Sequence, residues 1–146
     1  MNEPAVIRTM LGENMLRSRG VRARTLAVVG LSDRPDRPSH YVSAYMQQHG
    51  YRLFPVNPSL ATVLGEPCYA SLSALPEPPD VVNVFRLPGA VPAIVEEMLT
   101  LGWKHLWVKQ GIVNFEAARR AELGGIAVVM DRCIMVEHRR AQVDQR

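Results

Sequence analysis

The chain has 146 residues, of which 47% are hydrophobic and 21% are charged. This balance is typical of a folded globular protein, and the length corresponds to one ordinary domain with one hydrophobic core. The formal net charge is +3, and no segment approaches the roughly 20 consecutive apolar residues of a membrane span. Composition therefore argues against a disordered chain and a membrane-spanning protein, and we expect no membrane partner.

The N-terminal segment and the cysteines indicate the compartment. The N-terminus contains Glu3 and Glu13 and lacks the apolar stretch and cleavage site of a secretory signal. The two cysteines, Cys68 and Cys133, have neither Cys-x-x-Cys nor Cys/His ligand spacing, which favours a reduced compartment over a disulfide framework and predicts no metal site. We expect a cytoplasmic protein.

The first residues predict a helix and a basic connector. Apolar residues recur at helical spacing from Pro4 to about Met15, which indicates an amphipathic helix covering the domain. Residues 17–24 contain four arginines and a glycine and are typical of a solvated connector. We therefore treat residues 1–24 as an N-terminal helix and connector that precede the main domain.

From residue 26 onward, apolar runs alternate with helical patterns. Strands are expected at residues 26–30, 51–56, 81–85, 105–109 and 126–130, with a short edge strand near Cys68 and Tyr69. Helices are expected to start near Pro38, to follow residue 90, and to run from the cap Asn114 to Gly124. Such alternation requires parallel strands with right-handed crossovers. The predicted fold is α/β, a Rossmann-like doubly wound sheet in a single domain over residues 25–138, followed by a tail over residues 139–146.

The ligand site of such a fold lies outside the carboxyl ends of the strands, where the strand order reverses. The loop after the first strand, residues 30–39, contains Gly30, which allows close backbone approach, and two hydroxyl donors, Ser32 and Ser39. It leads into a helix N-terminus, which favours an anion. This combination predicts a phosphate cradle. The alternative is a polar loop that contains glycine and serine without binding anything.

Basic residues follow several strands. They are Arg34, Arg37, Arg86, Lys109 and Arg132. Each by itself is typical of a solvated surface residue, but if the strand assignments hold they converge on one edge of the sheet. Together they favour a ligand with several phosphates, because the guanidinium donors match phosphate oxygens.

Two other function classes are weaker. A nicotinamide-dependent oxidoreductase would have Gly-x-Gly-x-x-Gly after the first strand and an acidic residue ending the second, and this chain has neither. A nucleic-acid-binding protein would interleave aromatic residues with its basic segment, and residues 17–24 contain none. Both stay open as alternatives, and we expect no nucleic-acid partner.

Five strings carry a resemblance to a known family: residues 27–32, 34–39, 55–58, 109–114 and 129–133. Together they resemble the CoA-binding protein family, a small bacterial relative of the CoA-binding domain in the succinyl-CoA synthetase alpha subunit. The resemblance spans about residues 26–138 and implies coenzyme A as the ligand. The residues that it implies for CoA binding are Gly30, Leu31, Ser32, Arg34, Arg37, Pro38, Ser39, Val56, Asn57, Pro58, Phe85, Arg86, Gln110 and Gly111.

No arrangement typical of catalysis accompanies these residues, since neither a Ser/His/Asp set nor a pair of carboxylates stands out. The resemblance therefore implies a module that binds CoA or acyl-CoA without complete catalytic machinery, alongside an unidentified protein partner. We expect His138 to lie at a solvated helix end. A thiol exchange between Cys133 and CoA is the less favoured of two readings, the other being an ordinary rim residue.

Overall fold

A computed structural model describes residues 1–12 and 24–144. The central sheet has five strands in the order β2-β1-β5-β6-β7, and every pairing within it is parallel. The elements in chain order are α1 (Pro4–Leu11), β1 (Thr25–Val29), α2 (Pro38–Gln48), β2 (Arg52–Val56), β3 (Thr62–Val63), β4 (Glu66–Pro67), η2 (Leu72–Ala74), β5 (Val81–Val84), η3 (Pro88–Ala90), α3 (Val91–Leu101), β6 (His105–Val108), α4 (Phe115–Leu123), β7 (Ala127–Val129) and α5 (Ile134–Asp144). The predicted α/β fold with a parallel sheet is confirmed.

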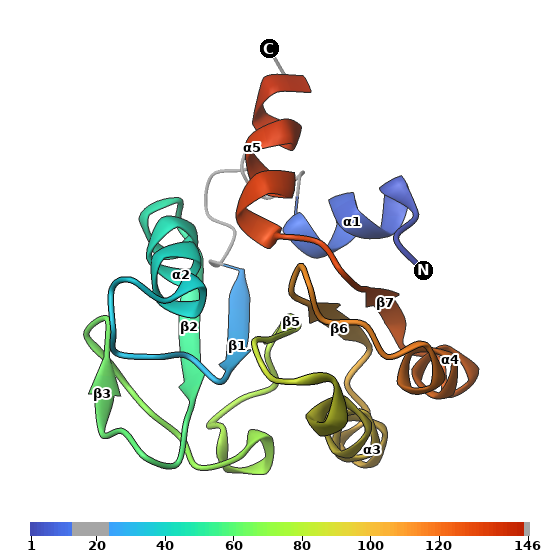
Figure 1. The fold of residues 1–146 in the computed structure, drawn as a ribbon, viewed down its shortest axis with the longest axis horizontal. Coiled ribbons are helices and arrows are strands. Elements are labelled where there is room, and N and C mark those ends of the chain that lie inside the picture. The colour runs from blue at the N-terminus through green and yellow to red at the C-terminus, as the bar shows by residue number, and fades with distance from the viewer. Residues whose placement is uncertain (13–23, 145–146) are drawn as a thin grey trace.

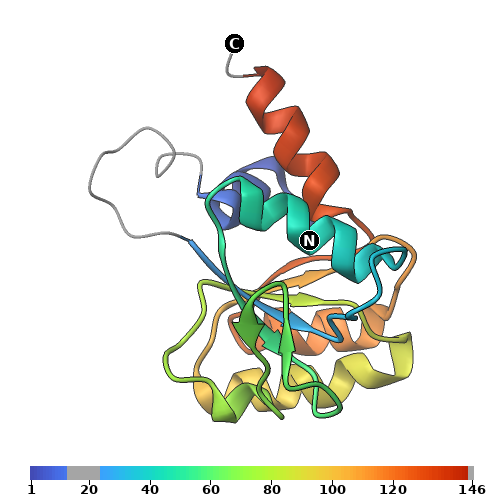
Figure 2. The ribbon, with the colours of Figure 1, turned by 90° about the vertical axis from the view of Figure 1, so that its left-hand side faces the viewer.

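Helices cover both faces of the sheet (Figures 1 and 2). Helices α1, α2 and α5 lie on one face, and α3 and α4 lie on the other. Strand β1 shows why both faces are apolar: Leu26 and Val28 join the core under α2, whereas Ala27 and Val29 join the core under α3 and α4. Successive side chains of a strand point to opposite faces, so a strand buried on both faces is apolar throughout.

The predicted helix signals act as expected in the second half of the chain. The side chain of Asn114 caps α4, since its Oδ1 accepts a hydrogen bond from the backbone N–H of Ala117 at 3.0 Å. Helix α4 ends at Leu123, before Gly124. Near the predicted edge strand, Tyr69 forms an isolated parallel bridge with Val56 of β2, while the small antiparallel pair β3 and β4 precedes it.

The N-terminal helix is shorter than the sequence pattern predicted. It ends at Leu11, because Gly12 adopts a left-handed conformation (φ 68°) and its N–H bonds back to the carbonyls of Arg8 and Thr9. The rest of the predicted helix, residues 13–15, and residues 17–23 of the connector lie outside the described part of the chain. The buried face expected for this helix is present, with Ile7 and Met10 in the core.

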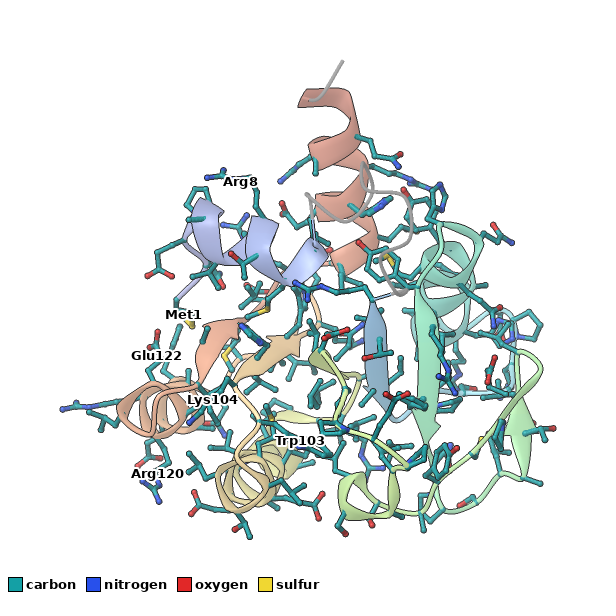
Figure 3. The ribbon with its side chains drawn as sticks, turned by 180° about the vertical axis from the view of Figure 1, so that it is seen from behind. Met1, Arg8, Trp103, Lys104, Arg120 and Glu122 are labelled. Atoms are coloured by element: carbon teal, nitrogen blue, oxygen red, sulfur yellow. The ribbon has the colours of Figure 1, made fainter. Side chains whose placement is uncertain are left out.

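The N-terminal segment covers the outer edge of β7. The backbone N–H of Asn2 donates to the carbonyl of Val128 at 3.2 Å. The ammonium of Met1 lies 3.0 Å from Oε2 of Glu122 on α4 (Figure 3). An edge strand presents unpaired backbone groups, and here the chain's own first residues pair with some of them. Within residues 1–12 and 24–144, no helix is both long and apolar enough to cross a membrane.

Candidate functional site

A groove runs along the carboxyl edge of the sheet at β1. Strand β1 lies between β2 and β5, so the strand order reverses at this point. It has two chambers. The cationic chamber, of about 310 Å³, is lined by Gly30, Ser32, Arg34, Arg37, Pro38, Ser39, Phe85 and Lys109. The apolar chamber, of about 300 Å³, is lined by Pro38, Tyr41, Val42, Asn83, Phe85, Lys109, Gln110, Cys133, Ile134, Met135 and Val136. Pro38, Phe85 and Lys109 line both chambers, so the two chambers adjoin each other.

Gly30 is required where the loop leaves β1. Its φ is 88°, and a Cβ atom there would lie 2.7 Å from the carbonyl oxygen of Phe85. Its N–H donates to the carbonyl of Val56 on β2 at 3.0 Å. Gly30 thus contacts the ends of β2 and β5 at once, and only glycine fits there without strain.

Two serine hydroxyls hold the cradle loop against the start of α2. The N–H of Ser32 donates to Oγ of Ser39 at 2.9 Å, and the N–H of Arg34 donates to Oγ of Ser32 at 3.1 Å. Each hydroxyl therefore accepts a backbone hydrogen bond and keeps its own proton to donate. The N-cap residue of α2, Arg37, gives the helix no side-chain cap. The N-terminus of α2 thus faces the groove with its dipole uncapped, an arrangement that favours a bound anion.

The basic residues divide between the groove and another part of the surface. Arg34, Arg37 and Lys109 line the cationic chamber. Arg34 lies 3.7 Å from the exposed carboxylate of Asp36, whereas neither Arg37 nor Lys109 forms an ion pair with a described residue. Arg86 is exposed and its side chain packs beside Gly30, where a Cβ atom would be 2.9 Å from its Cδ.

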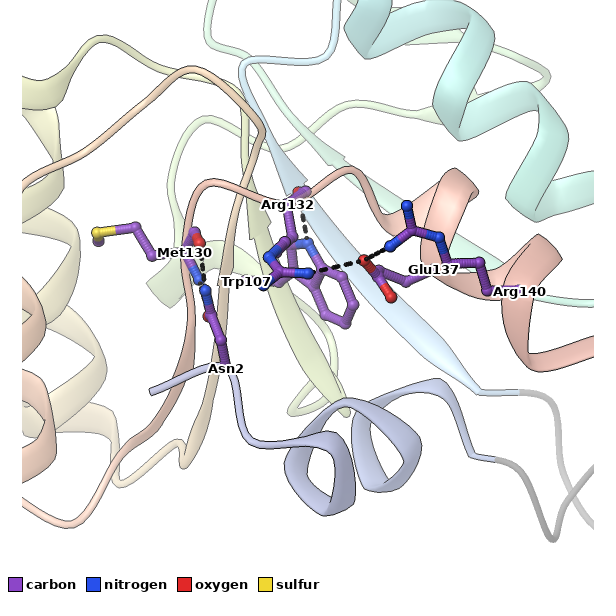
Figure 4. Close-up of polar contacts among 6 residues, drawn as sticks. All are labelled: Asn2, Trp107, Met130, Arg132, Glu137 and Arg140. Carbon is purple, nitrogen blue, oxygen red and sulfur yellow. Dashed lines mark hydrogen bonds and ion pairs between the residues drawn. The ribbon is translucent and has the colours of Figure 1, made fainter. Parts of the chain in front are cut away.

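Arg132 does not join this group, so the expected convergence of all five basic residues was wrong. Its guanidinium lies 3.4 Å from Oε1 of Glu137, which also pairs with Arg140 at 3.2 Å (Figure 4). The physical reason is that Glu137 lies in the first turn of α5, is almost fully buried, and draws the guanidinium to itself. Arg132 lines a separate pocket between α1 and α5.

Six predicted site residues line neither chamber: Arg86 and Gly111, and four around the exit of β2, namely Leu31, Val56, Asn57 and Pro58. Nδ2 of Asn57 donates to the carbonyl of Leu31 at 3.1 Å, and its Oδ1 accepts from the N–H of Ser59 at 2.9 Å. Leu31 and Val56 are buried, and Pro58 is exposed. The exit of β2 thus anchors the cradle loop through Asn57. Direct ligand contact by these six residues stays a prediction.

The turn at Gln110 and Gly111 closes the far side of the groove. The N–H of Gly111 donates to Oδ1 of Asp131 at 2.7 Å. Asp131 itself has a φ of 62°, a conformation that few non-glycine residues adopt and that often marks a functional region. Gln110, held by this turn, lines the apolar chamber.

Asn83 is a groove residue that sequence reasoning missed. It lies on β5, its side chain is 1% exposed, and neither Nδ2 nor Oδ1 has a hydrogen-bond partner within the described structure. A buried amide without partners is rare in native proteins and calls for an explanation, such as a ligand. The available signal was a single polar residue in the middle of the otherwise apolar run 81–85. Tyr41, on the exposed side of α2, was missed as well.

Hydrogen bonds with Trp107 and Asn2 hold the segment that carries Cys133 in place. Nε1 of the fully buried Trp107 donates to the carbonyl of Arg132 at 2.9 Å (Figure 4). The side chain of Asn2 pairs with both backbone groups of Met130, accepting from its N–H at 2.7 Å and donating to its carbonyl at 2.8 Å. These contacts position the connection from β7 to α5, and with it the half-buried Cys133 in the apolar chamber.

His138 is not solvated, contrary to the expectation from its charged neighbours. It is 1% exposed, and its Nδ1 hydrogen-bonds with the hydroxyl of Tyr45 on α2 at 2.8 Å. Burial, with a further contribution from the nearby His49, lowers its pKa below the ordinary value of 6.5. The packing of α5 against α2 decides this burial. Among residues 1–12 and 24–144, no group of three or more His, Cys, Asp or Glu side chains could hold a metal ion.

Comparisons with known proteins identify relatives of nearly the whole chain. A family model described as a CoA binding domain matches residues 24–139. The chain is 46% identical over 117 residues to the uncharacterized protein YneT of Bacillus subtilis, covering 80% of this chain and 87% of that protein. The solved structure of cell-free ID.343 from Thermus thermophilus matches with a TM-score of 0.83 and 38% identity, over 95% of this chain and 98% of the other.

A larger protein is also similar. The chain is 24% identical over 121 residues to an ADP-forming acetate–CoA ligase of Archaeoglobus fulgidus. The match covers 76% of this chain but only 18% of the ligase. The similarity thus concerns one small part of that enzyme.

Proposed function

Because the chain belongs to the CoA-binding domain family, we propose that it binds coenzyme A or an acyl-CoA in the groove at the carboxyl edge of its sheet. One observation carries this proposal: two adjoining chambers of opposite character share Pro38, Phe85 and Lys109. Coenzyme A has the same polarity, with phosphates at one end and a long arm of low charge at the other.

The cationic chamber suits the phosphates. Arg37 and Lys109 have no acidic partner among the described residues, so their charges are available to an anion. The uncapped N-terminus of α2 and the close backbone approach at Gly30 supply N–H groups and space for phosphate oxygens. Arg34, Arg86, Ser32 and Ser39 complete this end of the proposed site.

The apolar chamber suits the arm of CoA. That arm is a flexible chain with two amide groups and a terminal thiol. The apolar lining includes Val42, Phe85 and Ile134, and Asn83 offers a donor and an acceptor at its base. An amide of the ligand would satisfy both atoms of the Asn83 side chain at once, which explains why a polar residue occupies a buried strand.

A nicotinamide dinucleotide is the alternative ligand. It would place a ribose at the end of β2, where an acidic side chain normally accepts its hydroxyl protons. Here Asn57 occupies the exit of β2 and its amide is engaged with Leu31 and Ser59. The structure thus favours CoA over NAD, and a direct comparison of the two ligands tests the choice.

The test is thermal unfolding of the full chain with each ligand. A ligand that binds only the folded state stabilises it by about 2.7 kcal/mol at a hundredfold excess over its dissociation constant. We expect CoA to raise Tm by several degrees and NAD to raise it less. Equal shifts with both ligands, or none with CoA, would overturn the proposal.

Matched arginine variants locate the site. Arg37→Ala should weaken CoA binding by about tenfold, and higher salt should weaken it in the parent protein, because the contact is electrostatic. Arg119→Ala removes an equal charge from the exposed surface of α4, on the opposite face of the sheet, and should leave the affinity unchanged. Equal effects of the two substitutions, measured by calorimetry, would show that the cationic chamber is not the site.

We propose further that the protein acts as a binding module in the cytoplasm of a bacterium, where it presents CoA to a protein partner. The family match and the single small domain support a binding role. The acetate–CoA ligase extends far beyond the matched part, so its reaction is not carried over to this chain. Incubation of the pure chain with CoA, ATP, magnesium and short carboxylic acids should yield no acyl-CoA above background.

A further inference from the structure

A cysteine lines the apolar chamber. Cys133 is half-buried, directly precedes α5, and its carbonyl accepts the hydrogen bond from the N–H of Glu137 that begins the helix. It therefore lies at the N-terminal end of α5, among the residues that line the apolar chamber. Lys109 lines the same chamber and adds a positive charge.

A second observation marks the chamber as a binding site independently of the cysteine. Asn83 is 1% exposed, lines the chamber, and has no hydrogen-bond partner for either amide atom within the described structure. A buried amide of this kind calls for a hydrogen-bond partner, and the chamber gives such a partner access to Asn83. The partner must offer both a donor and an acceptor, as an amide does.

The proposed function identifies the chemistry that reaches Cys133. If the phosphates of CoA occupy the cationic chamber, its arm continues past Pro38 and Phe85 into the apolar chamber, since these residues line both. The amides of the arm then come within reach of Asn83. The arm ends in a thiol, so a sulfur of the ligand enters the chamber that contains Cys133.

On the basis of that proposed function, we propose that Cys133 is a redox modification site that forms a mixed disulfide with CoA when the bound ligand is a CoA disulfide. The Cys133 thiolate attacks one sulfur of the CoA disulfide, whose S–S bond breaks. A new S–S bond joins Sγ of Cys133 to the bound CoA. The second CoA leaves as a thiolate and takes up the proton that Cys133 lost, so one disulfide is exchanged for another.

The other cysteine provides a matched control. Cys68 lines neither chamber, and it lies after β4, near the loop that carries Asp33. Burial, together with the charge of Asp33, raises the pKa of the Cys68 thiol. A smaller fraction of Cys68 than of an ordinary cysteine is therefore thiolate at neutral pH. In addition, the arm of a ligand in the groove would not reach Cys68.

The test uses the full chain, CoA disulfide and mass spectrometry of the intact protein under non-reducing conditions. We expect one CoA adduct, removed by dithiothreitol and assigned to Cys133 by peptide mapping. Cys68→Ser should retain the adduct and Cys133→Ser should lose it. Glutathione disulfide, which lacks the phosphates, should react at least about tenfold more slowly, because only the CoA compound is held in the groove.

Binding of reduced CoA, measured by calorimetry on the parent and on Cys133→Ser, separates the two proposals. Retained binding with no adduct, with an adduct on Cys68, or with equal rates for both disulfides overturns the redox site and leaves the proposed function intact. Loss of CoA binding in the parent overturns both. If Cys133→Ser fails to fold, peptide mapping of the parent adduct still decides whether Cys133 is the modified residue.

Discussion

Replacing Asn83 with valine should make the ligand-free protein more stable and should weaken its binding of CoA. Both amide atoms of Asn83 lie buried without a partner in the described structure, and leaving a buried polar group unsatisfied costs about 1–3 kcal/mol. Valine is apolar, suits a buried strand, and removes that cost. Asn83→Val should therefore raise the free energy of unfolding by about 1–3 kcal/mol.

The magnitude is measurable for a chain of this size, since 1 kcal/mol shifts Tm by roughly 2–4 °C in proteins of about 150 residues or more. Calorimetric unfolding without ligand should show the rise, and titration with CoA should show at least about a tenfold loss of affinity, as expected for one lost hydrogen-bonded pair.

Ser43→Ala is the control for this prediction. The hydroxyl of Ser43, on α2, is also buried without a partner, but Ser43 lines neither chamber. Its replacement should stabilise the protein slightly and leave CoA affinity unchanged. If Asn83→Val instead lowers Tm of the free protein, the amide is satisfied without ligand, and the reasoning from its burial is wrong.

Two further predictions concern backbone strain and pH. Gly30→Ala should lower the free energy of unfolding by about 1–3 kcal/mol in urea titrations, because the left-handed backbone and the neighbouring carbonyl leave no room for Cβ; Gly89→Ala, where space is open, should cost far less. For His138, the folded pKa is lowered by burial and by His49, so the unfolded chain takes up the proton first. The stability that depends on neutral His138 should be fully present above pH 6.5 and fall as the pH drops below it. His138→Gln should reduce this loss between pH 7 and pH 5 and leave the loss that comes from His105, whose pKa is also lowered by burial. An unchanged pH profile in His138→Gln would contradict the assignment.

The sequence by itself determined the fold class, and it predicted a ligand site at the carboxyl edge of the sheet. Short apolar runs bounded by turn signals are typical of strands covered on both faces, and their alternation with helices favours a parallel sheet. Gly30 could be singled out because a glycine directly after a strand allows close backbone approach, and in the structure a Cβ atom there would lie 2.7 Å from the carbonyl oxygen of Phe85. Asn114 acts as a cap for the same kind of local reason.

Only the tertiary structure decided which side chains meet. Arg132 has the sequence context of the groove arginines, yet the buried carboxylate of Glu137 holds it on another surface. His138 stands among charged residues, yet the packing of α5 against α2 buries it beside Tyr45. Asn83 looked like an ordinary member of a strand, and its missing partners became visible only once every neighbour was placed. Periodicity and turn chemistry are local properties that a sequence states directly, whereas burial and pairing depend on contacts between residues far apart in the chain, which the sequence pattern does not specify.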